Sequence, residues 1–312
     1  MRVPQLSHLS SLVAFLGYIM LTGCAGPKNP SFDVTPSQAR AELMEMRARP
    51  ASLHRPIVII GGYHDIGVGP WLLESKLKPA LGNDADDRIV CVTVGYETSF
   101  DRCRRTVIAA VDEAFGRPLK QSHESNDSQD ADKMKANETI EVDVVAFSMG
   151  GIVARDAALP RVGERQLKIA RLFTISTPHA GSRWADGLPD MTHSIDPRIA
   201  DMRSESEFLE RLNQALLTVD NEPAAGDAAA RLKYPIVAYV RLGDTVVGPE
   251  NAAPPGSTPF WVSNPVFQPA HIGASVDSRI IADIARRIRH EKPLTRGEPT
   301  PLPSSVADAT ES

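Results

Sequence analysis

The stretch "VVAFSMGGIVAR", residues 144 to 155, decides the fold class of this chain. Its apolar run, which is typical of a buried strand, ends at Phe147; one serine follows, and two glycines open a segment with helical spacing. A hydroxyl at the tip of a buried strand costs free energy when it has no hydrogen-bond partner. The order strand, serine, helix therefore indicates a turn that exposes the hydroxyl of Ser148.

Small residues flank this serine, with Ala146 two positions before it and Gly150 two positions after it. In a tight strand-to-helix turn, larger side chains at these two positions would collide, so the pattern favours such a turn. The first amides of the following helix would stabilise negative charge that develops beside the hydroxyl. Ser148 is therefore predicted to be a nucleophile, and the alternative is a serine that only caps a helix.

Short apolar runs alternate with amphipathic segments from Pro56 onward. The predicted strands are "PIVIIGG", "RIVCVTV", "EVDVVAF", "KIARLFTIS" and "YPIVAYVRL", and the predicted helices are "PWLLESKLKPAL", 101–115, 149–158 and "DSRIIADIARRI". This alternation predicts an α/β fold with a mostly parallel sheet and helices on both faces. With 312 residues, of which 42% are hydrophobic, the chain is long enough to bury one large core.

The main domain is expected to span residues 51–292. The proline-containing segment 24–50 predicts a tether, the polar segment 120–138 a solvated loop, and the Pro- and Ser-rich segment 293–312 a disordered tail. Apolar residues near helical spacing in 197–219 predict a small helical insertion, which either covers the sheet or forms a lid.

The N-terminus has the features of a signal peptide over residues 1–23: Arg2, the apolar stretch "LSSLVAFLGYIM", and "LTGC" ending at Cys24. The small residues before Cys24 resemble the bacterial lipoprotein box, in which the cysteine acquires lipid. Ala25 after the cysteine is associated with sorting to the outer membrane. The resemblance implies a lipid-anchored protein of the bacterial cell envelope, on the periplasmic side, and a plain secretory signal is the alternative.

Charge and motif content exclude several classes of function. The net charge of −5, with dispersed Lys and Arg, argues against a nucleic-acid partner. The chain has no H-E-x-x-H, C-x-x-C or acidic calcium loop, and "GGYHDIGVG" lacks G-x-G-x-x-G spacing, so neither a metal nor a cofactor is expected. Cys91 and Cys103 either pair or are buried free thiols, and the oligomeric state stays open.

Four separated strings resemble the lipase and esterase branch of the α/β-hydrolase superfamily. They are "IVIIGGY", "DVVAFSMGGIVAR", "ISTPHAGS", and "RLGDTVVGPE" followed by "AHIGA", and together they cover residues 56 to about 290. The resemblance implies an α/β-hydrolase fold and the hydrolysis of carboxylic esters. Two positions depart from the family pattern: Ala146 replaces the first glycine of G-x-S-x-G, and Gly61 stands where the family often has histidine.

A Ser-His-Asp triad is expected in the chain order of this fold, with Ser148 as nucleophile, Asp244 as acid and His271 as base. Asp244 follows a predicted strand at its carboxyl end, where α/β sheets collect functional groups. His271 follows the last predicted strand, and His179 in the "TPHAGS" turn is its rival. The alternative acids are Asp196 and Asp277.

The backbone N–H groups of Tyr63 and Met149 are expected to form the oxyanion hole. The sequence thus predicts a membrane-tethered serine esterase or lipase that cleaves a small-molecule or lipid ester through an acyl-enzyme. The alternatives are an amidase, thioesterase or acyltransferase with the same triad, and a binding lipoprotein with weak or no turnover on a hydrolase scaffold. Because the insertion 197–219 is short, an esterase-like preference for short-to-medium acyl chains is expected.

Overall fold

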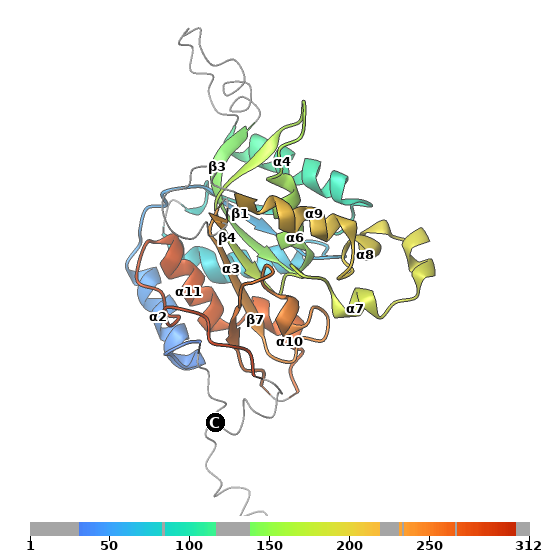
Figure 1. Cartoon of the computed structure of the whole chain (residues 1–312). Coiled ribbons are helices and arrows are strands. Elements are labelled where there is room, and N and C mark those ends of the chain that lie inside the picture. Colours follow the sequence, from blue (N-terminus) through green and yellow to red (C-terminus); the bar gives the residue numbers. More distant parts are fainter. Residues whose placement is uncertain are drawn as a thin grey trace, which may run out of the picture. The chain divides into compact units, whose positions relative to one another are not determined.

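The computed structural model describes residues 31–82, 85–116, 138–218, 231–232, 234–265 and 267–303. These residues belong, up to Leu302, to one unit built around a six-stranded sheet (Figure 1). The expected signal peptide, Cys24, and the predicted polar loop up to residue 137 lie outside the described residues.

Every strand pair of the central sheet is parallel, as predicted, and the strand order is β2-β1-β3-β4-β7-β8. The strands are β1 Ile57–Ile60, β2 Ile89–Val92, β3 Glu138–Phe147, β4 Gln166–Ile175, β7 Ile236–Arg241 and β8 Phe260–Val262. After β1 the chain adds β2 on one side and then β3 on the other, so the direction of winding reverses between β1 and β3. In open α/β sheets, functional groups gather at the carboxyl ends of the strands at such a point.

Helices cover both faces of the sheet (Figure 1). One face carries α2 Pro36–Ala48, α3 Val68–Leu81 and α11 Ser278–Ile288, and the other carries α4 Phe100–Phe115, α6 Met149–Ala157 and α9 Glu207–Ala215. Alternate residues of β3 serve the two faces: Val144 and Ala146 pack toward α4 and α6, and Val145 and Phe147 toward the opposite layer. This sheet order, with Ser148 directly after β3, is an α/β-hydrolase fold, which confirms the predicted fold class.

Short elements complete the described part of the chain. They are α7 Arg183–Asp186, η2 Asp190–Ser194, α8 Pro197–Asp201, β5 Leu217–Thr218 paired with β6 Arg231–Leu232, η3 Pro249–Asn251 and α10 Ala270–Ser275. No helix in the described ranges is both long and apolar enough to cross a membrane.

The segment 197–219, as far as Thr218, contains α8, α9 and β5. Its apolar side chains are buried: Ile199, Met202, Phe208, Leu209, Leu212 and Leu216. The ring of Phe208 stacks on that of Phe100 from α4, with 4.3 Å between ring centroids. The apolar side chains of this segment therefore pack in the core on the α4 face of the sheet, and the lid arrangement stays a prediction.

Part of the range assigned to a tether is helical, since residues 36–48 form α2. Thr35 and Gln38 form a capping box that begins the helix. The helix packs on α3 and α11, and Glu42 forms an ion pair with Arg286 of α11. Ala39, Leu43 and Met46 have helical spacing and pack toward the core, but the prolines at positions 27, 30, 36 and 50 favoured a tether in the sequence.

Residues just after 292 are also held against the domain. Thr295 pairs with Phe32 in an antiparallel bridge. The carboxylate of Asp283 on α11 accepts hydrogen bonds from the amides of Leu294 and Thr295, at 2.6 and 2.8 Å. The first residues of the range expected to be a disordered tail are therefore ordered here.

The two described cysteines are free thiols and lie on opposite faces of the sheet. Cys103 on α4 is buried beside Val94, whereas Cys91 on β2 contacts Pro70 and Glu74 of α3. The sequence left open whether Cys91 and Cys103 form a disulfide or are free thiols, and in the structure they are free thiols. Cys91 is exposed rather than buried because β2 is an edge strand.

Candidate active site

The turn between β3 and α6 places Ser148 at the carboxyl edge of the sheet. Ser148 has φ 53° and ψ −130°, a backbone conformation that a residue with a side chain seldom adopts. Two hydrogen bonds hold it: the Ser148 amide donates to the Ile175 carbonyl (2.9 Å), and the Thr177 hydroxyl donates to the Ser148 carbonyl (2.8 Å). The end of β4 thus fixes the strained turn.

The glycine at position 150 is required by the neighbouring backbone. A Cβ there would lie 2.5 Å from the Gly61 carbonyl oxygen and 2.7 Å from that of Ile60, closer than real contacts allow. A Cβ at Gly151 would overlap the side chain of Thr177. These close approaches are the physical reason for the small residues that the sequence places around Ser148.

The structure brings together the three side chains that the sequence singled out. His271 Nε2 lies 3.0 Å from Ser148 Oγ, and His271 Nδ1 lies 2.9 Å from Asp244 Oδ2. Asp244 follows β7, and His271 lies in the first turn of α10, after β8. With Nδ1–H donating to the carboxylate, Nε2 can accept the hydroxyl proton of Ser148.

Asp244 is buried, and its second oxygen, Oδ1, accepts hydrogen bonds from the amides of Val246 and Val247, at 3.0 and 3.1 Å. Burial alone would raise the pKa of this carboxyl group. The hydrogen bond and charge of His271, together with the Val247 amide, outweigh burial and hold the pKa below its usual value. Asp244 is therefore ionised at neutral pH and can orient the imidazole.

The alternative acids lie elsewhere. Asp277 accepts hydrogen bonds from Arg241 and Arg279, both at 2.8 Å, and Asp196 binds Tyr63 and Arg198. Both carboxylates therefore bind these partners and not His271.

The alternative base, His179, is fully buried behind the turn. Its Nδ1 lies 2.9 Å from Arg155 Nη1, and its Nε2 lies 3.0 Å from Thr174 Oγ1. Burial, with the nearby Arg155 charge, keeps the pKa of His179 well below its usual value, so the ring is neutral. Nδ1 then accepts from Arg155, and Nε2–H donates to Thr174. His179 has the structural role that the sequence favoured.

The chain that leaves β1 passes directly beside the serine. A Cβ at Gly62 would lie 3.0 Å from Ser148 Cβ and 3.5 Å from Ser148 Oγ, so a side chain here would crowd the serine. In the described ranges, neither the Tyr63 amide nor the Met149 amide donates to a backbone carbonyl. First-turn amides such as that of Met149 have no acceptor within their helix. Both N–H groups are therefore available to an anion beside Ser148.

A group that sequence reasoning missed holds the loop containing Tyr63. The Tyr63 hydroxyl donates to Asp196 Oδ2 (2.9 Å), Arg198 forms an ion pair with the same carboxylate (2.6 Å), and the Arg198 guanidinium lies 4.8 Å from the centroid of the Tyr63 ring. Burial and the hydrogen bond to Asp196 raise the pKa of Tyr63 to about 12. The only sequence signal was Asp196-Pro197, which is typical of a helix start.

Exposed apolar side chains surround the same edge of the sheet. They lie in the segments that follow β1, β2, β4 and β8: Ile66, Val68, Trp71, Tyr96, Trp184, Met191, Ile195, Phe267, Ile272 and Val276. Most large apolar residues of a soluble surface occur singly, so their concentration on the segments around one edge is informative. Among the described residues, no group of three or more His, Cys, Asp or Glu is placed to hold a metal ion.

No family model and no curated protein matches this sequence. Among solved structures, it is similar to the phospholipase PlaB from Legionella pneumophila, with 14% identity, a TM-score of 0.37, and coverage of 64% of this chain and 45% of that chain. It is also similar to lipase 1 from Pelosinus fermentans, with 13% identity, a TM-score of 0.41, and coverage of 77% of this chain and 100% of that chain. A metagenomic carboxyl esterase is similar with 13% identity, a TM-score of 0.43, and coverage of 77% of each chain. This chain thus spans less than half the length of the Legionella phospholipase. The fold assignment is based on the strand order and on the turn at Ser148.

Proposed function

We propose that this protein is a serine hydrolase that cleaves carboxylic esters. The observation that carries the proposal is the chain of hydrogen bonds from Asp244 through His271 to Ser148, on a strained turn beside two free amides. A serine that only caps a helix would need neither the imidazole nor the buried carboxylate.

In the first half of the reaction, Ser148 Oγ attacks the acyl carbon while His271 Nε2 accepts the hydroxyl proton. The carbonyl oxygen becomes negatively charged and accepts hydrogen bonds from the amides of Tyr63 and Met149. When the tetrahedral intermediate collapses, His271 returns the proton to the leaving alkoxide. An alcohol is released, and the acyl group stays on Ser148.

In the second half, His271 takes a proton from water, and the hydroxide oxygen attacks the acyl carbon of the acyl-enzyme. The same amides stabilise the second oxyanion. Collapse transfers the proton from His271 to Ser148 Oγ and releases the carboxylic acid. Throughout both halves, Asp244 accepts the Nδ1–H hydrogen bond and stabilises the imidazolium that forms twice.

A fluorophosphonate probe tests the proposal, because it reacts with an activated serine and mimics the tetrahedral intermediate. We expect covalent labelling of the wild-type chain at Ser148, together with hydrolysis of nitrophenyl esters. A binding protein without turnover would leave the probe unreacted. Parallel assays with matched amide and thioester substrates separate an esterase from an amidase or thioesterase with the same triad.

The substrate profile follows from the surroundings of the serine. The exposed apolar side chains at the carboxyl edge of the sheet favour an apolar acyl group. Apolar side chains of α8 and α9 pack in the core, which supports a segment that covers the sheet rather than a lid that opens at a lipid surface. We therefore expect short-to-medium acyl esters to be preferred, with no jump in rate when the substrate passes its solubility limit. A steep rise on emulsification would contradict this and indicate an interfacial lipase.

We also propose that Cys24 is lipidated and anchors the protein in the bacterial outer membrane, on the basis of the sequence around it. Wild-type protein is then expected to partition into detergent, whereas Cys24→Ser protein should not be anchored in this way. Stable attachment requires more than one acyl chain, as bacterial lipoproteins carry. Cys91→Ser is the matched control, since Cys91 lies in the sheet. Recovery of all wild-type protein in the soluble fraction would refute the anchor.

A further inference from the structure

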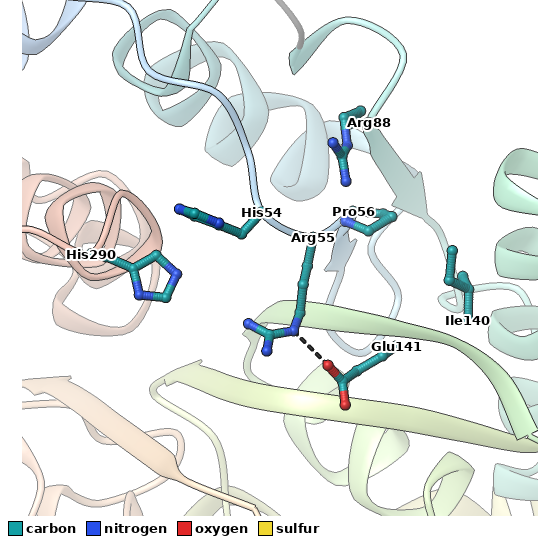
Figure 2. Close-up of a pocket in the computed structure, with 7 residues that line it drawn as sticks. All are labelled: His54, Arg55, Pro56, Arg88, Ile140, Glu141 and His290. Carbon is teal, nitrogen blue, oxygen red and sulfur yellow. Dashed lines mark hydrogen bonds and ion pairs between the residues drawn. The ribbon is translucent and has the colours of Figure 1, made fainter.

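A cavity of about 500 Å³ lies where several strands begin (Figure 2). Its lining comes from the segments before β1 and β2, from the first half of β3, and from the residues after α11. The lining residues are His54, Arg55, Pro56, Arg88, Ile140, Glu141 and His290. Four of these seven side chains can be cationic and one is acidic, so the cavity has the composition of an anion site.

The cavity is separate from the candidate active site. Its residues lie at the amino ends of the parallel strands, whereas Ser148 follows the carboxyl end of β3. The stretch of β3 from Glu141 to Phe147 alone corresponds to roughly 20 Å of extended chain. A ligand here would not touch Ser148, and the inference does not depend on the proposed function.

The charges that line the cavity are unbalanced in the described part of the chain. Arg55 is neutralised by Glu141, with Arg55 Nε 2.6 Å from Glu141 Oε2, as the dashed line in Figure 2 shows. The guanidinium of Arg88 forms no hydrogen bond or ion pair with any described residue. Guanidinium groups bind phosphate and carboxylate oxygens in pairs of hydrogen bonds, which makes Arg88 a suitable ligand for an oxyanion.

Two histidines meet in the lining of this cavity. The rings of His54 and His290 meet edge to face, with 4.5 Å between centroids. Burial lowers the pKa of His290, and the charges of Arg171, His54 and Arg55 lower it further, while Asp143 opposes them. An anion between these groups would relieve the repulsion and favour the protonated ring. Binding of an anion would therefore take up protons and strengthen as the pH falls.

His290 also occupies a position that usually belongs to glycine. Its φ is 58°, and it follows Arg289, the C-cap of α11. Its amide donates to the Arg287 carbonyl (3.1 Å), and the next amide, of Glu291, donates to the Arg286 carbonyl (2.8 Å). This is a Schellman motif, in which glycine avoids the cost of the left-handed conformation. The chain keeps an imidazole here although a glycine would fit the backbone better.

We propose that this cavity, which Arg88, His54 and His290 line, binds a phosphate-type oxyanion, free or as the phosphate of a lipid headgroup, and binds it more tightly at mildly acidic pH. The Arg88 guanidinium supplies a permanent charge, and the His290 imidazole supplies charge and two N–H donors once protonated. The apolar lining by Pro56 and Ile140 leaves room for a small organic group on the phosphate.

Thermal unfolding of the full chain with inorganic phosphate tests the site, with sodium chloride at matched ionic strength as the reference. For a Kd of about 1 mM, 10 mM phosphate should raise the Tm by about 3 °C at pH 6. The shift should be much smaller at pH 8. Ester hydrolysis should be unaffected by any of the substitutions below, because none lies near Ser148.

His290→Gly is the most informative variant, because it should lose phosphate binding without losing stability. A variant that merely failed to fold would lose both. Without phosphate it should be as stable as the wild type or more stable, since glycine accepts φ 58° at no cost. With phosphate its Tm should not rise. Arg88→Gln should also lose the shift, whereas Lys76→Gln, which removes an exposed charge from α3, should keep it.

Vesicle sedimentation at pH 6 separates the two sources of phosphate, in a Cys24→Ser background so that an anchor on that residue contributes nothing. Stronger binding to phosphatidylglycerol than to phosphatidylcholine vesicles, lost in His290→Gly, would identify a headgroup. A phosphate-induced Tm shift without this preference would identify a soluble ligand. Equal phosphate shifts in wild type, Arg88→Gln and His290→Gly, with equal vesicle binding, would overturn the proposal.

Discussion

Replacing Ser148 with alanine should lower the rate of ester hydrolysis by roughly 10⁴- to 10⁶-fold, with the unfolding transition almost unchanged. The hydroxyl makes one hydrogen bond, to His271, and the backbone bonds that fix the turn come from the Ser148 amide and carbonyl, which alanine retains. His271→Ala should have a similar effect. The double variant should be little worse than either one, since the two side chains act in one step.

The measurement is kcat/KM for a nitrophenyl ester beside a thermal unfolding curve. Ser75→Ala is the matched control, because the Ser75 hydroxyl on α3 donates a hydrogen bond to the Leu72 carbonyl and to no other described residue. Asp244→Asn should reduce the rate less than Ser148→Ala, because an amide can still contact Nδ1 but cannot stabilise the imidazolium. Asp196→Asn and Asp277→Asn should not reproduce that loss. Full activity in Ser148→Ala would exclude the proposed nucleophile.

The sheet and the serine turn could be predicted from the sequence because both leave a local pattern. Strands buried on both faces are continuous apolar runs, and small residues flank Ser148 in the sequence. The contacts that require Gly150 and Gly151 come from other segments, namely Ile60, Gly61 and Thr177, and only the structure shows them. Asp244 and His271 could be chosen because parallel strands bring their carboxyl ends to one edge, so chain order restricted the candidates. The structure places His271 beside Ser148 and Asp244 beside His271.

Features that depend on contacts between distant segments could not be predicted. The group formed by Tyr63, Asp196 and Arg198 joins residues more than a hundred positions apart, and no spacing rule connects them. Cys91 lies in an apolar run that is typical of a buried strand, but an edge strand has no neighbour on one side, and strand order is a property of the whole sheet. The contact between the rings of His54 and His290 also joins distant parts of the chain, so the sequence could not show it.

Gly150→Ala is expected to damage both the activity and the stability, because the added methyl group would meet backbone rather than a movable side chain. Its Cβ would lie 2.5 Å from the Gly61 carbonyl oxygen and 2.7 Å from that of Ile60. Either the helix α6 or the end of β1 must move. Overpacking of this kind typically costs about 2–3 kcal/mol, which lowers the Tm by roughly 5–10 °C in a domain of this size.

The loss of activity should exceed what the loss of stability explains. The Ile60 and Gly61 carbonyls belong to the segment that leads into Gly62 and Tyr63, so a shift that relieves the clash separates the Tyr63 amide from the Met149 amide. Misplacing one oxyanion donor reduces kcat by about 10²- to 10³-fold. This loss should be seen when kcat is measured well below the denaturation temperature of the variant, where the protein is folded. Gly297→Ala is the matched control, since a Cβ there has no neighbour within 4 Å. If Gly150→Ala keeps its kcat, the two segments are not coupled in this way, and the oxyanion donors must lie elsewhere.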